Sequence, residues 1–80
     1  MPHGMPTLYE AATYRITVPG YSGTHWADWA SDLIVVDLTS QGCPVTILTG
    51  RFDQAALIGL LRRLYAHGVP LISVVYVDGE

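Results

Sequence analysis

The chain has 80 residues, of which 50% are hydrophobic and 14% are charged, and its formal net charge is −3. This composition excludes a disordered chain, because disordered segments are poor in apolar residues and rich in charge. The few basic residues are all arginine and acids outnumber them, so we expect no nucleic acid partner. The apolar runs fall short of the roughly 20 residues that a membrane span needs, so no membrane partner is expected either.

A short tail is predicted to precede a single domain. Residues 1–7 are rich in proline and glycine and are expected to form a flexible N-terminal tail, whereas residues 8–80 are expected to form one α+β domain. The N-terminus lacks the basic start and the apolar core of a secretory signal. Cys43 is the single cysteine and cannot form an intramolecular disulfide. We therefore expect a cytoplasmic protein.

The first half of the domain is predicted to contain two strands with a short helix between them. Tyr14–Val18 alternates apolar with polar side chains, as a strand with one buried face does, and Pro19-Gly20 ends it. A short helix is expected over His25–Ser31, with Thr24 as its N-cap. Leu33–Thr39 forms the second predicted strand and is apolar on both of its faces.

A hairpin, the main helix and a last strand follow. The third strand is predicted at Val45–Gly50, after a loop of about three to five residues. The long helix is predicted over about residues 53–67, with Asp53 as its N-cap and Gly68 as the left-handed residue after its end. Its expected core-facing stripe consists of Leu57, Ile58, Leu60, Leu61, Leu64 and Tyr65. The fourth strand, Leu71–Val77, is again apolar on both faces.

This order of elements predicts an α+β fold with a four-stranded antiparallel sheet in the ferredoxin-like split βαβ order, with a short first helix and one long helix. Both helices are expected to cover the same face of the sheet. An antiparallel sheet with one face in water normally alternates apolar and polar residues, and the second and fourth strands do not. The sequence therefore predicts that a second copy covers the other face in an isologous homodimer. The alternative is a monomer with several exposed aliphatic side chains.

Two surfaces are candidates for these protein contacts. On the sheet, the predicted interface residues are Val35, Val36, Val75 and Val77. On the long helix, Ala55 and Gly59 lie opposite the apolar stripe, where small side chains would let a helix of a second copy or of another protein approach closely. The alternative for the helix is that this strip reflects only an alanine-rich composition.

The aromatic residues indicate a possible ligand pocket. Tyr14, Trp26 and Trp29 could line a pocket between the sheet and the short helix, and His25 could supply its polar group. The alternative is that these rings form the core of so small a domain.

Two arginines form a second candidate ligand site. Arg15 and Arg51 come from strands that are neighbours in the predicted sheet. They could form salt bridges with a carboxylate such as Asp53 or Asp37. Alternatively, Arg51 could bind an anion at the N-terminus of the long helix.

No residue pattern predicts catalysis, a metal site or a cofactor. His25, Asp28 and Asp32 lie close together in the sequence, but no cysteine or second histidine lies nearby to complete a metal site. Ser22 lacks the Gly-x-Ser-x-Gly spacing of a hydrolase nucleophile. An enzyme is therefore the less favoured interpretation.

Two segments of the second half carry a family resemblance. Leu48–Leu61 and Gly68–Val74 contain the pattern TG…DQAALxGLL…GxPLxSV and follow a tryptophan pair, Trp26 and Trp29. In these features the chain resembles a family of short, uncharacterised bacterial proteins, and this resemblance implies no catalytic residues. Residues 53–74 are similar, more loosely, to the second half of ACT-type regulatory modules. That resemblance implies a ferredoxin-like dimer that binds small effectors between its subunits.

Two functions are compatible with these patterns. The favoured one is a small homo-oligomeric interaction or regulatory module without catalysis. The alternative is a dimeric small-molecule binder or cofactor-free enzyme of the dimeric ferredoxin-like barrel type, with the aromatic pocket as its site. An enclosed cavity that contains His25 would favour the second function, and closely packed rings would favour the first.

Overall fold

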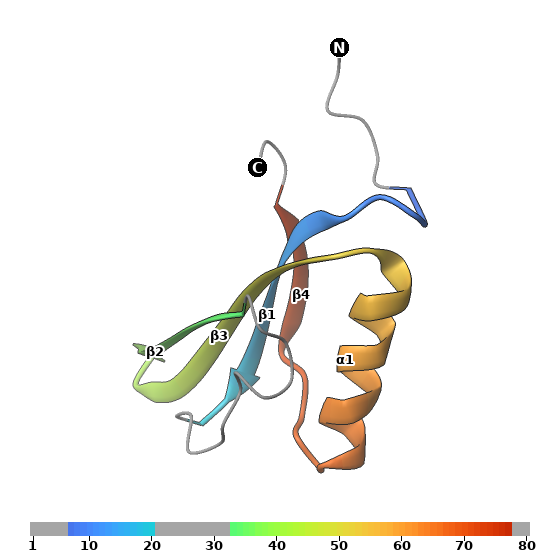
Figure 1. Cartoon of the computed structure of the whole chain (residues 1–80). Coiled ribbons are helices and arrows are strands. Elements are labelled where there is room, and N and C mark those ends of the chain that lie inside the picture. The colour runs from blue at the N-terminus through green and yellow to red at the C-terminus, as the bar shows by residue number, and fades with distance from the viewer. Residues whose placement is uncertain (1–6, 21–32, 78–80) are drawn as a thin grey trace.

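The computed structural model describes residues 7–20 and 33–77. These residues form five elements, shown in Figure 1: β1 (Ala12–Pro19), β2 (Ile34–Ser40), β3 (Cys43–Phe52), α1 (Gln54–Ala66) and β4 (Ser73–Val77). Most of the predicted tail and the whole predicted helix at His25–Ser31 lie outside the described residues. Within the described residues, no helix is long and apolar enough to cross a membrane.

The four strands form one sheet in the order β2-β3-β1-β4, and each neighbouring pair is antiparallel. Strands β3 and β4 are both antiparallel to β1 and therefore run parallel to each other on either side of it. Helix α1 connects these two strands and lies on one side of the sheet (Figure 1). The predicted α+β class and the predicted four-stranded antiparallel sheet are confirmed.

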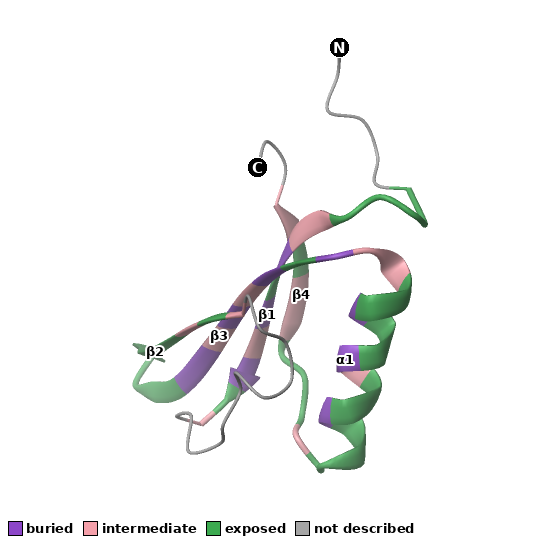
Figure 2. Cartoon of the chain, in the orientation of Figure 1, coloured by how far each residue is buried: buried purple, intermediate pink, exposed green. Residues whose placement is uncertain are grey.

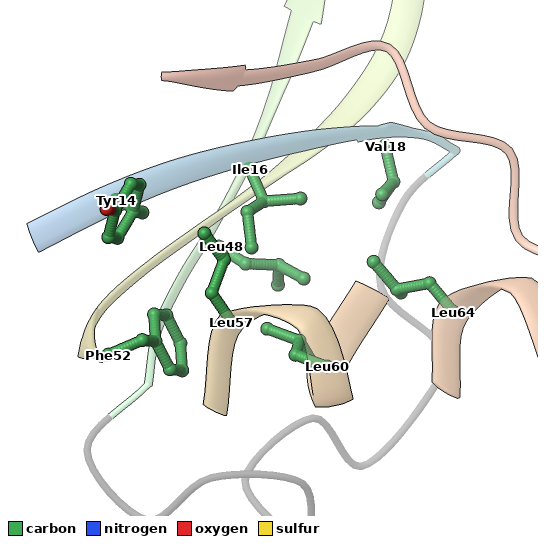
Figure 3. Close-up of a cluster of buried hydrophobic side chains, with 8 residues drawn as sticks. All are labelled: Tyr14, Ile16, Val18, Leu48, Phe52, Leu57, Leu60 and Leu64. Carbon is green, nitrogen blue, oxygen red and sulfur yellow. The ribbon is translucent and has the colours of Figure 1, made fainter. Parts of the chain in front are cut away.

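The core lies between α1 and the sheet. Alternate residues of a strand point to opposite faces, so β1 turns Tyr14, Ile16 and Val18 toward the helix, and each is at most 5% exposed. Their side chains meet those of β3 and of the helix in a single cluster (Figure 3). The other members of this cluster are Leu48, Phe52, Leu57, Leu60 and Leu64.

The buried stripe of α1 is narrower than predicted. Leu57, Leu60 and Leu64 are buried, but Ile58 is 45% exposed and Tyr65 is 86% exposed. Each of these two residues directly follows a buried leucine, which places it about 100° farther round the helix. The assignment of Ile58 and Tyr65 to the core stripe was therefore wrong.

Both ends of α1 confirm the predicted boundaries. At the start, the Asp53 carboxylate accepts a hydrogen bond of 2.8 Å from the backbone N–H of Ala56. At the end, Gly68 has a φ of 73° and donates its N–H to the Tyr65 carbonyl, while the N–H of Val69 bonds to the Leu64 carbonyl. These two bonds form a Schellman motif, which satisfies the last carbonyl groups of the helix.

The β2–β3 hairpin is tighter than predicted. Ser40 pairs with Cys43, so only Gln41 and Gly42 form the turn, and their φ angles are 52° and 81°. Two positive φ angles are typical of a type I′ turn, whose twist matches that of the flanking strands. The expected loop of three to five residues was wrong, because glutamine at the first turn position gives little sign of a positive φ.

Gly50 allows a close approach on the core face of β3. A Cβ atom at this position would lie 2.8 Å from Cζ of Phe52 and 3.2 Å from Cδ1 of Leu33. The ring of Phe52 thus packs over the backbone of its own strand, where only a glycine leaves room.

Candidate interaction surface

The face of the sheet opposite α1 has an apolar part and a basic part. Strand alternation and register place the following residues on this open face: Thr13, Arg15, Thr17 and Pro19 from β1, Ile34, Val36, Leu38 and Ser40 from β2, Cys43, Val45, Ile47, Thr49 and Arg51 from β3, and Ser73, Val75 and Val77 from β4. Figure 2 shows that β2 is coloured as exposed or half-buried along its whole length.

One edge of the open face is apolar. Ile34, Val36 and Leu38 are 62%, 46% and 39% exposed, and they pair with Thr49, Ile47 and Val45 of β3. We call Ile34, Val36, Leu38 and Ile47 the aliphatic strip; Val45 lies on the same face but is already buried, at 6% exposed. The helix side of the sheet already contains the core, so no described element buries the β2 half of this strip.

The middle of the open face carries the arginines. Arg15 of β1 pairs with Thr49 of β3, and Thr13 of β1 pairs with Arg51 of β3. We call these four residues the arginine patch. The Nη2 atom of Arg51 donates a hydrogen bond of 3.0 Å to the Ala11 carbonyl, which fixes the guanidinium against the start of β1.

Strand β4 adds a second apolar edge. Val75 pairs with Arg15 and is 46% exposed, and Val77 pairs with Thr13 and is half-buried. The arginine patch is thus flanked by aliphatic side chains on both sides. A partner on this face would meet an apolar surface with a basic centre.

The predicted sheet-interface residues do not share one face. Val36, Val75 and Val77 lie on the open face, whereas Val35 points to the helix side and packs against the core. Because adjacent residues of a strand point in opposite directions, Val35 and Val36 cannot serve the same surface. Ile34 and Leu38 lie on the same side of β2 as Val36.

Two of the predicted ligand-binding residues, Tyr14 and Arg51, lie on opposite faces of the sheet. Tyr14 is buried on the helix side, its hydroxyl accepts a 2.6 Å hydrogen bond from Nε2 of Gln54, and its ring lies 5.8 Å from that of Tyr76. Arg51 lies on the opposite face of the sheet. His25, Trp26 and Trp29 fall outside the described residues.

Two hydrogen bonds show how Arg51 and Asp53 are placed. Asp53 accepts from the helix backbone, and Arg51 donates to the backbone of Ala11 on the other face. Because Arg51 points away from α1, it cannot bind an anion at the N-terminus of that helix. Within the described residues, no three His, Cys, Asp or Glu side chains come together as a metal site would require.

The outer surface of α1 is the second candidate surface. Ala55 and Gly59 are exposed, and nothing lies within 4 Å of the position that a Cβ atom on Gly59 would take. The exposed side chains of Ile58 and Tyr65 lie on the same helix. This surface is less continuous than the aliphatic strip, because Arg62 and Arg63 interrupt it.

Comparisons with known proteins place the chain in a family. No curated protein and no solved structure matches it. The model of a domain of unknown function, DUF8691, matches residues 13–75, which contain most of the sheet and the whole of α1. A family of unknown function is what the sequence resemblance led us to expect. The chain belongs to the DUF8691 family.

Proposed function

We propose that the chain is a non-catalytic interaction or regulatory module that acts as a homodimer, with the open faces of two copies packed together. The observation that carries this proposal is the exposure of three consecutive outward-facing aliphatic residues, Ile34, Val36 and Leu38, on one strand. A strand with one face in water would normally carry polar residues at such positions.

The free energy of burial favours a second copy. Full burial of a valine, leucine or isoleucine side chain contributes about 1.5–3 kcal/mol, so covering side chains that are already half-buried would contribute about 1 kcal/mol each. Two aliphatic strips would together add several kcal/mol. That is a large fraction of the roughly 5–15 kcal/mol by which proteins of this kind are stable.

The size of the face is close to that of a small dimer interface. Four strands, the edge strand β2 being seven residues long, span about 19 Å by 23 Å, a flat footprint of about 440 Å² on each copy. Side chains make the accessible area larger than this footprint. The footprints of two copies, about 880 Å² together, approach the total of about 1,000 Å² that marks a specific interface.

The topology supports a ferredoxin-like arrangement, which we include in the proposal. Strands β3 and β4 are joined by a helix and separated by β1, and β1 and β2 are separated by β3. This strand order, with α1 as the crossover between β3 and β4, fits one split βαβ unit, whereas residues 21–32 of the β1–β2 connection lie outside the described residues. The looser similarity of residues 53–74 to ACT-type modules fits a regulatory role for the same dimer.

A matched pair of variants tests the proposal. Val36 on the open face and Ile58 on the outside of α1 are 46% and 45% exposed. Lysine at either position should therefore lower the stability of the monomer by a similar, small amount. We expect Val36→Lys to weaken dimerisation at least tenfold in light scattering, because its charge would be buried at the interface. Ile58→Lys should leave the dimer intact. Loss of the dimer in Ile58→Lys, with Val36→Lys unaffected, would move the interface to the helix and contradict the proposal.

A further inference from the structure

We propose that the arginine patch is a binding site for an oxyanion, a carboxylate or a phosphate group, and that the bound anion stabilises the dimer. This inference rests on the homodimer proposed above, because one face of the sheet would serve both purposes. It adds a class of ligand and a way in which that ligand would regulate assembly.

The placement of the two arginines is the first step. Arg15 and Arg51 are diagonal neighbours on adjacent antiparallel strands, and Thr49 and Thr13 occupy the other two corners of the same square. Diagonal Cα atoms on such a pair of strands are about 7–8 Å apart, within reach of two long side chains. The four residues therefore lie on one small area of the open face. The guanidinium group of Arg51 is held at the Ala11 end of that area, on the side of Thr13 away from Arg15.

The charge of this face is the second step. Arg15 and Arg51 are the charged side chains on the open face of the described sheet, and both are exposed. The chain as a whole has a net charge of −3. Asp37, the acidic residue of β2, points to the helix side, because it pairs with Thr46. Within the described residues, the open face thus supplies positive charge with no carboxylate of its own.

The donors of the patch fit an oxyanion. A guanidinium group carries five N–H donors in a planar fork that binds both oxygens of a carboxylate or phosphate. The bond from Nη2 of Arg51 to the Ala11 carbonyl uses part of that set and holds the group in place, so other N–H groups remain available. The hydroxyl groups of Thr13 and Thr49 can donate to the same ligand.

Dimerisation gives such a ligand a role. The arginine patch spans the two central strands, β1 and β3, so two stacked faces would bring the patches of both copies toward each other. Like charges that are removed from water repel strongly unless a counter-charge lies between them. An oxyanion between the copies would supply that counter-charge. The aliphatic strip then favours association through apolar burial, and the anion reduces the repulsion between the two arginine patches.

The experiment measures dimerisation of the full chain by sedimentation equilibrium in sodium phosphate, in sodium succinate and in sodium chloride at equal ionic strength. Equal ionic strength is essential because salt alone screens repulsion between charges. We expect phosphate or succinate to lower the dimer Kd at least tenfold relative to chloride, and the more effective of the two identifies the ligand group. The variants are Arg15→Gln, Arg15→Lys and, as a control on the helix, Arg62→Gln, each checked for folding by circular dichroism.

The outcomes separate this inference from the proposed function. Loss of the anion effect in Arg15→Gln, its reduction in Arg15→Lys and its retention in Arg62→Gln would support the site, since lysine keeps the charge but not the fork. A wild-type dimer of equal strength in all three salts would overturn the anion site and leave the dimer standing. A chain that stays monomeric in every salt would overturn both.

Discussion

Gly50 shows how a single residue sets the packing of the core. The ring of Phe52 lies over its backbone, and the nearest ring atom would be 2.8 Å from an added Cβ. The ring cannot move away freely, because Phe52 is itself buried in the cluster between the sheet and α1 (Figure 3). The close approach of an aromatic ring to a strand backbone is therefore built into the sequence at this position.

Gly50→Ala is expected to destabilise the fold. Overpacking of a well-filled core costs about 1–3 kcal/mol, and we expect a loss in this range in the free energy of unfolding, measured by urea denaturation. The control is Gly59→Ala on the exposed side of α1, where the added Cβ meets nothing within 4 Å. That variant should gain about 0.5–1 kcal/mol, because alanine is the better helix former. Equal stability of Gly50→Ala and the wild type would mean that Phe52 does not pack as described.

At the level of elements, the features that depend on nearby residues were predicted correctly. The start and end of α1 were predicted because Asp53 and Gly68 cap the helix through interactions with residues close to them in the sequence. The orientation of side chains was harder to predict. Val35 and Val36 are adjacent and equally apolar, and only the pairing of β2 with β3 shows which of them faces the core. Three residues of the predicted aromatic pocket, His25, Trp26 and Trp29, lie outside the described residues.

The β2–β3 turn was missed for a related reason. Gln41 has a φ of 52°, a backbone conformation that residues other than glycine, asparagine and aspartate seldom adopt. The geometry is imposed by the pairing of Ser40 with Cys43, a contact between strands that the local sequence does not reveal.

This turn offers a test at the same scale. Gln41→Asn would create the Asn-Gly pair that type I′ turns prefer, so we expect a gain of up to about 1 kcal/mol in the free energy of unfolding. Thermal unfolding followed by circular dichroism would measure it. A lower melting temperature for Gln41→Asn than for the wild type would show that the turn is not of this type.

At the level of the whole molecule, the two faces of the sheet differ in how well they are covered. The helix side holds the buried cluster, whereas the open side exposes an aliphatic strip next to the arginine patch. A chain of this size buries only about 60–65% of its unfolded surface and gains little stability from its own core. Association through the open face would supply the missing burial, and it would make stability depend on protein concentration.

Sedimentation equilibrium of the wild-type chain over a wide micromolar range, with phosphate present, tests the homodimer most directly. We expect a reversible equilibrium in which the average molar mass approaches twice the 8.7 kDa chain mass as the concentration rises. A single species of 8.7 kDa at every concentration would contradict it, because the aliphatic strip would then remain in contact with water.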